Sequence, residues 1–199
     1  MKDDLRGGWR LAARILPAAA LVLLLLLPIG AAGCGSQARE YAQDARSSYI
    51  SARAVLVGIE KFPSQMEEIL RSGDISAVAE DATALIDEAR DLMPTASSAF
   101  VTAQENAELL SGEDSEKFGS YADKLLELCG MNEQLINTYT EFIGASNSLL
   151  QGLPYNDDPA TLMPTLDYLD ELSMSIQQLN GSIERLEEET ESLYTQITQ

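Results

Sequence analysis

The chain has 199 residues, of which 45% are hydrophobic, so it has room for one packed domain after a targeting segment. Its formal net charge is -19, and a field of that sign repels phosphate backbones and anionic head groups, which argues against nucleic acid as a partner. The chain contains no histidine, which removes the commonest general base, the commonest metal ligand and the usual near-neutral pH sensor.

Residues 1–33 have the composition of a secretory signal. An apolar stretch covers residues 16–29 and includes five successive leucines, and the small residues 30–33 then lead to Cys34. The basic residues before the apolar stretch are Lys2, Arg6, Arg10 and Arg14.

The run Gly30-Ala31-Ala32-Gly33-Cys34 resembles the lipobox of bacterial membrane lipoproteins. The resemblance covers the chain up to about residue 35, and Ala31 departs from it where the family prefers a leucine-like residue. It implies that a diacylglyceryl group is attached to Cys34 and that cleavage before Cys34 makes it the mature N-terminus. The alternative is an uncleaved transmembrane anchor, although the apolar run is near the lower limit of about 20 residues. Both interpretations place residues 34–199 outside the cytoplasm, because the basic flank stays inside.

Three clusters of turn residues divide the rest of the chain into four segments of similar length. The breaks are Ser72-Gly73-Asp74, residues 111–114, and residues 151–159, where Asp158-Pro159 suits an N-cap and a first helical turn. The predicted helices therefore cover residues 36–71, 74–111, 114–151 and 158–199. Pro63 and Pro94 fall inside two of them, and each predicts a kink in a continuing helix, with a full break as the alternative.

Apolar residues recur at alternating spacings of three and four in all four segments, as in Leu169, Leu172 and Ile176. Four such helices with short turns predict an all-α domain, an elongated antiparallel up-down-up-down four-helix bundle with coiled-coil-like heptad packing. The first two seams are rich in alanine and the last two in large residues, so we expect small side chains to face large ones. The alternative is that the fourth helix pairs with a second copy of the chain as a homo-oligomer.

Several polar residues fall on the predicted seams, where asparagine commonly fixes helix register and where a row of polar groups can instead line a small-ligand pocket. These residues are Ser48, Asn106, Asn132, Ser146 and Thr190. Cys129 lies on an apolar flank, which favours a small buried hydrophobe over an interchain disulfide.

Two charge patterns mark helix surfaces. Arg39, Arg46 and Arg53 recur every seven residues, which predicts a solvated or salt-bridged outer face on the first helix. Five glutamates crowd the end of the fourth helix within residues 184–191, so we expect that end to fray through like-charge repulsion. The acidic run Asn156-Asp157-Asp158 is better explained by turn and cap chemistry than by calcium binding.

Attachment at Cys34 would place the loop at residues 151–159 at the far tip of an antiparallel bundle. We expect Leu153, Pro154 and Tyr155 in that loop to contact a protein partner. The sequence thus predicts a lipid-anchored cell-envelope lipoprotein, without metal, cofactor or enzymatic activity, that acts as a scaffold or accessory subunit. The alternatives are an extracytoplasmic ligand-binding or sensing bundle, and an enzyme that uses only carboxylates or tyrosines.

Overall fold

The computed structural model describes residues 34–71, 75–111, 116–152 and 159–199, and residues 34–199 form one compact unit. In the described ranges every regular element is a helix, which confirms the all-helical prediction. The elements are α1 (Cys34–Glu60), α2 (Phe62–Arg71), α3 (Ile75–Ser111), α4 (Glu116–Gly152), the short 3-10 helix η2 (Pro159–Thr161) and α5 (Met163–Thr198).

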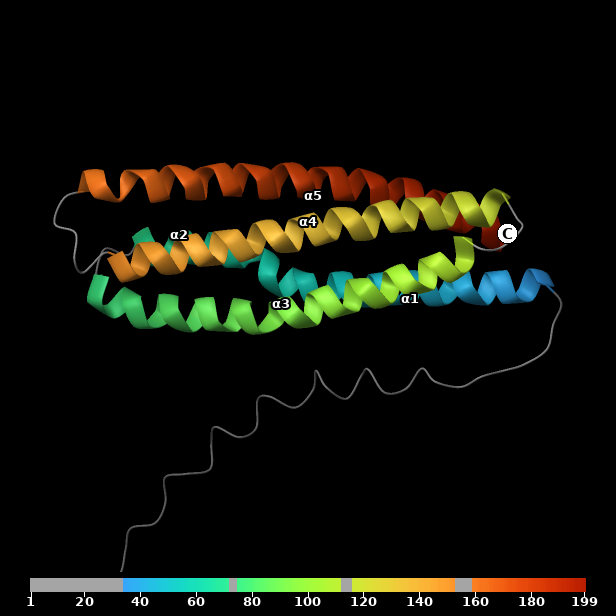
Figure 1. Cartoon of the computed structure of the whole chain (residues 1–199), viewed down its shortest axis with the longest axis horizontal. Coiled ribbons are helices and arrows are strands. Elements are labelled where there is room, and N and C mark those ends of the chain that lie inside the picture. Colours follow the sequence, from blue (N-terminus) through green and yellow to red (C-terminus); the bar gives the residue numbers. More distant parts are fainter. Residues whose placement is uncertain (1–33, 72–74, 112–115, 153–158) are drawn as a thin grey trace, which may run out of the picture. The chain divides into compact units, whose positions relative to one another are not determined.

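The long helices lie side by side (Figure 1). α1 packs most extensively on α3, α3 on α4, and α4 on α5, whereas α1 and α5 touch at few points. α2 rests mainly on α3. Within the described ranges, no helix is both long and apolar enough to span a membrane. The arrangement leaves one seam, between α1 and α5, that is less closely packed than the others.

One hydrophobic core runs through the unit and takes residues from all of its long helices. Ala45, Ala52 and Ile59, on one predicted seam of α1, are buried. On the other predicted seam Val55 is only half-buried, and the flanking Leu56 is buried in its place, so burial follows the predicted seams of α1 only in part. Because this core is complete within residues 34–199, we expect the unit to fold without residues 1–33.

Alanine dominates the buried faces of α1 and α3. These two helices pack most extensively on each other, and the rings of Tyr49 and Phe100 also meet between them. Alanine has no side chain beyond Cβ, and two alanine faces therefore allow helix backbones to approach closely. The buried alanines of the two helices are Ala38, Ala42, Ala45, Ala52, Ala82, Ala89, Ala96, Ala103 and Ala107.

The prediction of one continuing helix over residues 36–71 is wrong, and its alternative, a full break near Pro63, is observed: the structure divides the segment into α1 and α2 at Lys61. Pro63 has no backbone N–H to donate and its ring clashes with the preceding turn, so the helix ends and restarts. The backbone N–H of Gln65 donates to the Lys61 carbonyl at 3.1 Å and opens the new helix. Phe62 and Met66 remain buried, so the apolar pattern continues across the break.

The other prolines behave differently. α3 runs through Pro94 without interruption, as the predicted continuing helix requires. The fourth predicted helix starts too early, because Pro159 begins η2 and α5 starts only at Met163, with Leu162 as its N-cap and Pro164 in its first turn. Proline is tolerated in a first turn, where its missing N–H has no helical partner to lose.

Candidate functional site

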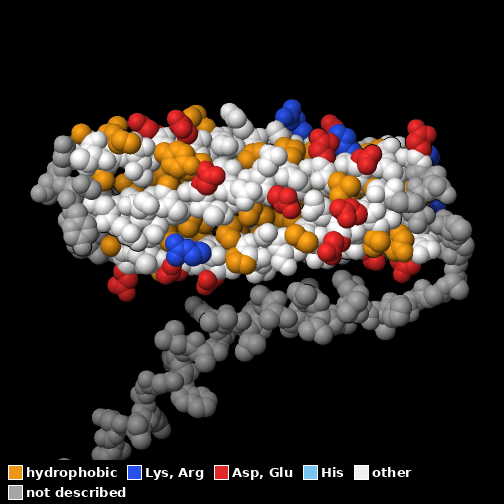
Figure 2. Space-filling view, viewed as in Figure 1, with side chains coloured by type: hydrophobic (Ala, Val, Ile, Leu, Met, Phe, Trp, Pro, Cys, Tyr) orange, Lys and Arg blue, Asp and Glu red, His pale blue; other side chains and the backbone are white. Residues whose placement is uncertain are grey.

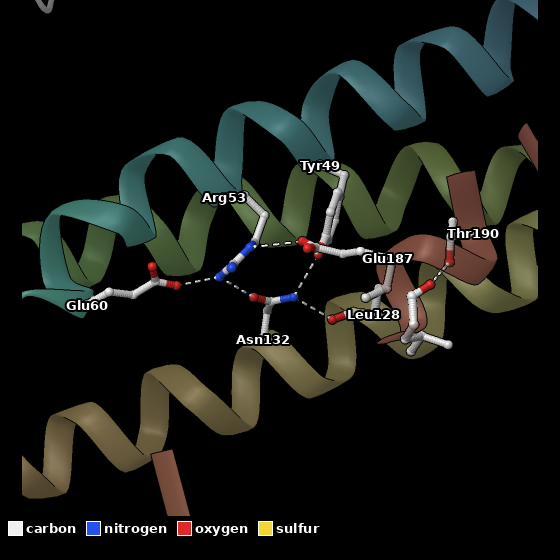
Figure 3. A network of polar contacts seen from close by, with 8 residues as sticks. Tyr49, Arg53, Glu60, Leu128, Asn132, Glu187 and Thr190 are labelled. Carbon is white, nitrogen blue, oxygen red and sulfur yellow. Dashed lines mark hydrogen bonds and ion pairs between the residues drawn. The ribbon is translucent and has the colours of Figure 1, made fainter. Parts of the chain in front are cut away.

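A network of polar side chains joins α1, α4 and α5 (Figure 3). Arg53 of α1 lies at its centre and its side chain is 19% exposed. Its Nε donates to Glu187 Oε1 of α5 at 3.0 Å, and its Nη1 donates to Glu60 Oε1 at 2.8 Å and to Asn132 Oδ1 of α4 at 3.3 Å. One guanidinium group therefore connects three helices.

Tyr49 and Asn132 complete the network. The Tyr49 hydroxyl donates to Glu187 Oε1 at 2.7 Å and accepts from Asn132 Nδ2 at 3.2 Å. Asn132 Nδ2 also donates to the Leu128 carbonyl at 2.8 Å, so a fully buried amide uses both of its ends. Buried polar groups are stable when they are paired in this way, and such pairing fixes the register of neighbouring helices.

A second link between α1 and α5 lies one heptad closer to the start of α1. Arg46 Nε and Nη2 donate to the two carboxylate oxygens of Glu191 at 2.9 and 3.0 Å. The Arg46 guanidinium carbon also lies 4.7 Å from the centre of the Tyr194 ring. The α1–α5 seam is thus bridged mainly by ion pairs.

The surroundings of these groups shift their pKa values. Burial, with the hydrogen bond to Glu187, raises the pKa of the Tyr49 phenol far above its ordinary value. Burial opposes the charge on Arg53, but the attraction of Glu60 and Glu187 outweighs it and raises the guanidinium pKa. The hydrogen bonds to Glu191 raise the pKa of Arg46. At neutral pH the phenol is therefore neutral and both guanidinium groups are charged.

A cavity of about 680 Å³ lies along the same seam. Its floor is apolar and includes Tyr121, Leu125 and Leu128 of α4. Its walls are formed by α1 and α5, and both bridging ion pairs lie in them. A volume of this size is within the usual range of about 300–1,000 Å³ for small-molecule sites.

The predicted functional residues are not tested by this geometry. Cys34 is the first residue of α1. Leu153, Pro154 and Tyr155 lie outside the described residues, as do Asn156, Asp157 and Asp158.

The polar seam residues do not form one row. Asn106 Nδ2 of α3 donates to Ser48 Oγ of α1 at 2.8 Å. Thr190 lines the cavity and donates to the Leu186 carbonyl at 2.7 Å, whereas the buried hydroxyl of Ser146 has no hydrogen-bond partner. Only Thr190 thus fits the expected pocket lining, and Asn132 belongs to the adjacent network.

The expected solvated or salt-bridged outer face holds for Arg39 and Arg46 but not for Arg53; Arg46 is 36% exposed and pairs with Glu191. Arg53 is mostly buried between helices and does not lie on an outer face. Arg39 is exposed and lines a separate cavity of about 710 Å³ with Lys117 and Phe118. The sequence offers two clues to the network: the seam position of Asn132, and the spacing of seven between Arg53 and Glu60, which puts those two residues on one helix face.

The prediction of a frayed end on α5 is also wrong, since the helix continues to Thr198. Glu187 and Glu191 pair with arginines of α1, and Glu189 pairs with Lys124 at 3.4 Å. These cations from other helices offset the repulsion that the sequence pattern indicated.

Cys129 is fully buried and has a free thiol, which confirms that it packs as a small hydrophobic side chain. Burial raises the pKa of the thiol to about 12, so it stays protonated at neutral pH. In the described ranges no group of three or more acidic or cysteine side chains is arranged to hold a metal ion.

Comparison with known proteins gives no match: no family model, no curated protein and no solved structure matches this chain.

Proposed function

We propose that the chain is a lipid-anchored cell-envelope lipoprotein, held at the extracytoplasmic face of a membrane by Cys34, that acts by protein–protein contact as a scaffold or accessory subunit. The signal-like residues 1–33 and the lipobox-like run before Cys34 support this membrane location. Acidic side chains are spread over the face shown in Figure 2 and basic ones are fewer, so attachment through surface charge to anionic lipid is disfavoured.

We further propose that the long helices form an up-down-up-down bundle with coiled-coil-like packing. Contacts between helices support the alternating directions: Arg46 and Arg53 of α1 meet Glu191 and Glu187 of α5 in reverse order. Between α4 and α5, Lys124 pairs with Glu189 and Glu141 accepts from Tyr168, again in reverse order. This arrangement puts the start of α5 at the end far from Cys34.

The observation that carries the proposed contact is an exposed apolar surface at the start of α5. Four of the eight exposed large hydrophobic side chains in the described ranges lie within residues 163–174. Met163, Leu166 and Met174, the α5 stripe, are 50%, 39% and 56% exposed, and Met163 and Met174 are about three helical turns apart on one face. Flexible methionine side chains are common at protein-binding surfaces.

Crosslinking in intact cells tests the contact. A photoreactive amino acid at Leu166 of the full-length protein is expected to give a discrete adduct that the pair Met163→Ser and Met174→Ser reduces. The matched control is the same probe at Leu109, which is 55% exposed but lies on α3. Identical adducts from both positions would contradict a contact through the α5 stripe.

Metabolic labelling tests the lipid anchor separately. Cys34→Ser is expected to abolish metabolic labelling with a radioactive fatty acid, whereas Cys129→Ser leaves it unchanged. Equal labelling of the Cys34→Ser variant and the unaltered protein would remove the anchor from the proposal.

The cavity between α1, α4 and α5 supports a second candidate function, a ligand-binding or sensing bundle.

A further inference from the structure

The cavity on the α1–α5 seam has features that select a class of ligand. We propose that it binds an amphiphilic organic cation, a molecule with one apolar tail and one ammonium group. This inference deepens the second candidate function, and it does not depend on the lipid anchor or on the α5 stripe.

The apolar part of the ligand would lie on the floor of the cavity. Tyr121, Leu125 and Leu128 form that floor, and each is about 1% exposed. These side chains are almost fully covered in this structure, so a ligand would reach them only when the side chains above them move; once uncovered, the two leucines favour a tail over a polar body.

The mouth of the cavity is framed by the two ion pairs. Arg46 and Arg53 are seven residues apart, so the Arg46–Glu191 and Arg53–Glu187 bridges are separated by about 10 Å along α1. Ile50 lies between the two arginines, lines the cavity and is 48% exposed. Ile50 takes part in neither ion pair, so its side chain can change rotamer to admit a ligand without breaking them.

The charges at the mouth favour a cation. Both guanidinium groups are already occupied, Arg46 by two bonds to Glu191 and Arg53 by three acceptors. Glu188 also lines the cavity and has no hydrogen bond or ion pair in the described structure. An anionic head group would lie close to the carboxylates of Glu187, Glu188 and Glu191, whereas an ammonium group can pair with Glu188 directly. The net charge of -19 also concentrates cations near the surface.

Isothermal titration calorimetry with three probes that share a tail tests this proposal. The unit of residues 34–199 carrying Cys34→Ser is titrated with dodecyltrimethylammonium, dodecyl sulfate or dodecyl maltoside, each below its micelle-forming concentration. We expect saturable binding of one ammonium probe per chain and binding about ten-fold weaker or more for the other two. Equal affinity for the three probes, or no binding of the ammonium probe, would overturn the proposal.

Variants at the mouth locate the binding. Ile50→Trp fills the mouth and is expected to abolish binding, whereas Val57→Trp, at a 46% exposed position outside the cavity, is expected to leave it unchanged. Glu188→Gln is expected to weaken binding about two- to five-fold, as for loss of one partly exposed ion pair. Glu184→Gln, the same change on α5 outside the cavity, serves as its control. Binding at many weak sites that Ile50→Trp does not affect would place the cation on the acidic surface, against the proposal.

Discussion

Replacement of Arg53 by methionine tests whether the polar network stabilises the fold. Arg53→Met removes the donor to Glu187, Glu60 and Asn132 while it keeps most of the apolar stem. Hydrogen bonds to charged groups contribute about 1.5–3 kcal/mol each, but exposed pairs contribute only about 0–1 kcal/mol. The Glu60 and Glu187 side chains are 26% and 34% exposed, so water can solvate them after the loss, whereas the Asn132 carbonyl stays buried. We therefore expect the free energy of unfolding to fall by about 2 kcal/mol.

The assay is urea unfolding of residues 34–199 followed by far-ultraviolet circular dichroism. Arg90→Met is the matched control, because the Arg90–Asp87 pair is 55% and 62% exposed and its loss should cost less than about 0.5 kcal/mol. Glu187→Met and the double variant complete a cycle, with an expected coupling of about 1 kcal/mol. A loss for Arg53→Met no larger than that of Arg90→Met would refute the reasoning.

Three further predictions concern other side chains and glycines of the unit. Because burial raises the pKa of Cys129 to about 12, the native thiol should resist a disulfide reagent at about pH 8 and react once urea unfolds the protein; fast native reaction would contradict the burial. Because the pKa of Tyr49 is raised in the folded state, the unfolded state loses a proton above about pH 10 that the folded state keeps. The free energy of unfolding should therefore fall as pH rises through that range, and it should fall less in Tyr49→Phe. Equal slopes for the two proteins in urea titrations at several pH values would contradict this. Gly130→Ala in α4 should raise the free energy of unfolding by about 0.5–1 kcal/mol, because no heavy atom lies within 4 Å of the new Cβ. Gly58→Ala should raise it less, because its Cβ would lie 3.2 Å from Leu92 Cδ1. The reverse order in the urea assay would contradict the packing of the structure around these two glycines.

Helix positions and buried faces followed from local patterns. The spacing of Leu169, Leu172 and Ile176 predicts one buried stripe, and all three are buried. Such patterns depend on residues within two helical turns of one another, so one sequence is sufficient to read them.

Pairing between distant helices could not be predicted in the same way. Arg53 and Glu187 are separated by 134 positions, and nothing near either residue indicates that they meet. Arg53 therefore resembled a surface residue, although its neighbours on α4 and α5 bury it. The cavity escaped prediction for the same reason, since Ile50, Leu125 and Glu188 come from three helices. The break at Lys61 was uncertain because proline can either kink a helix or end it, and packing decides between the two.

The proposed location at a membrane depends on the lipid anchor. Intact mass spectrometry of the gene product purified from membranes is the most direct test of that anchor. The account predicts a polypeptide that begins at Cys34 and carries the added mass of a diacylglyceryl group on that residue. An intact Met1 together with an unmodified Cys34 thiol would contradict it.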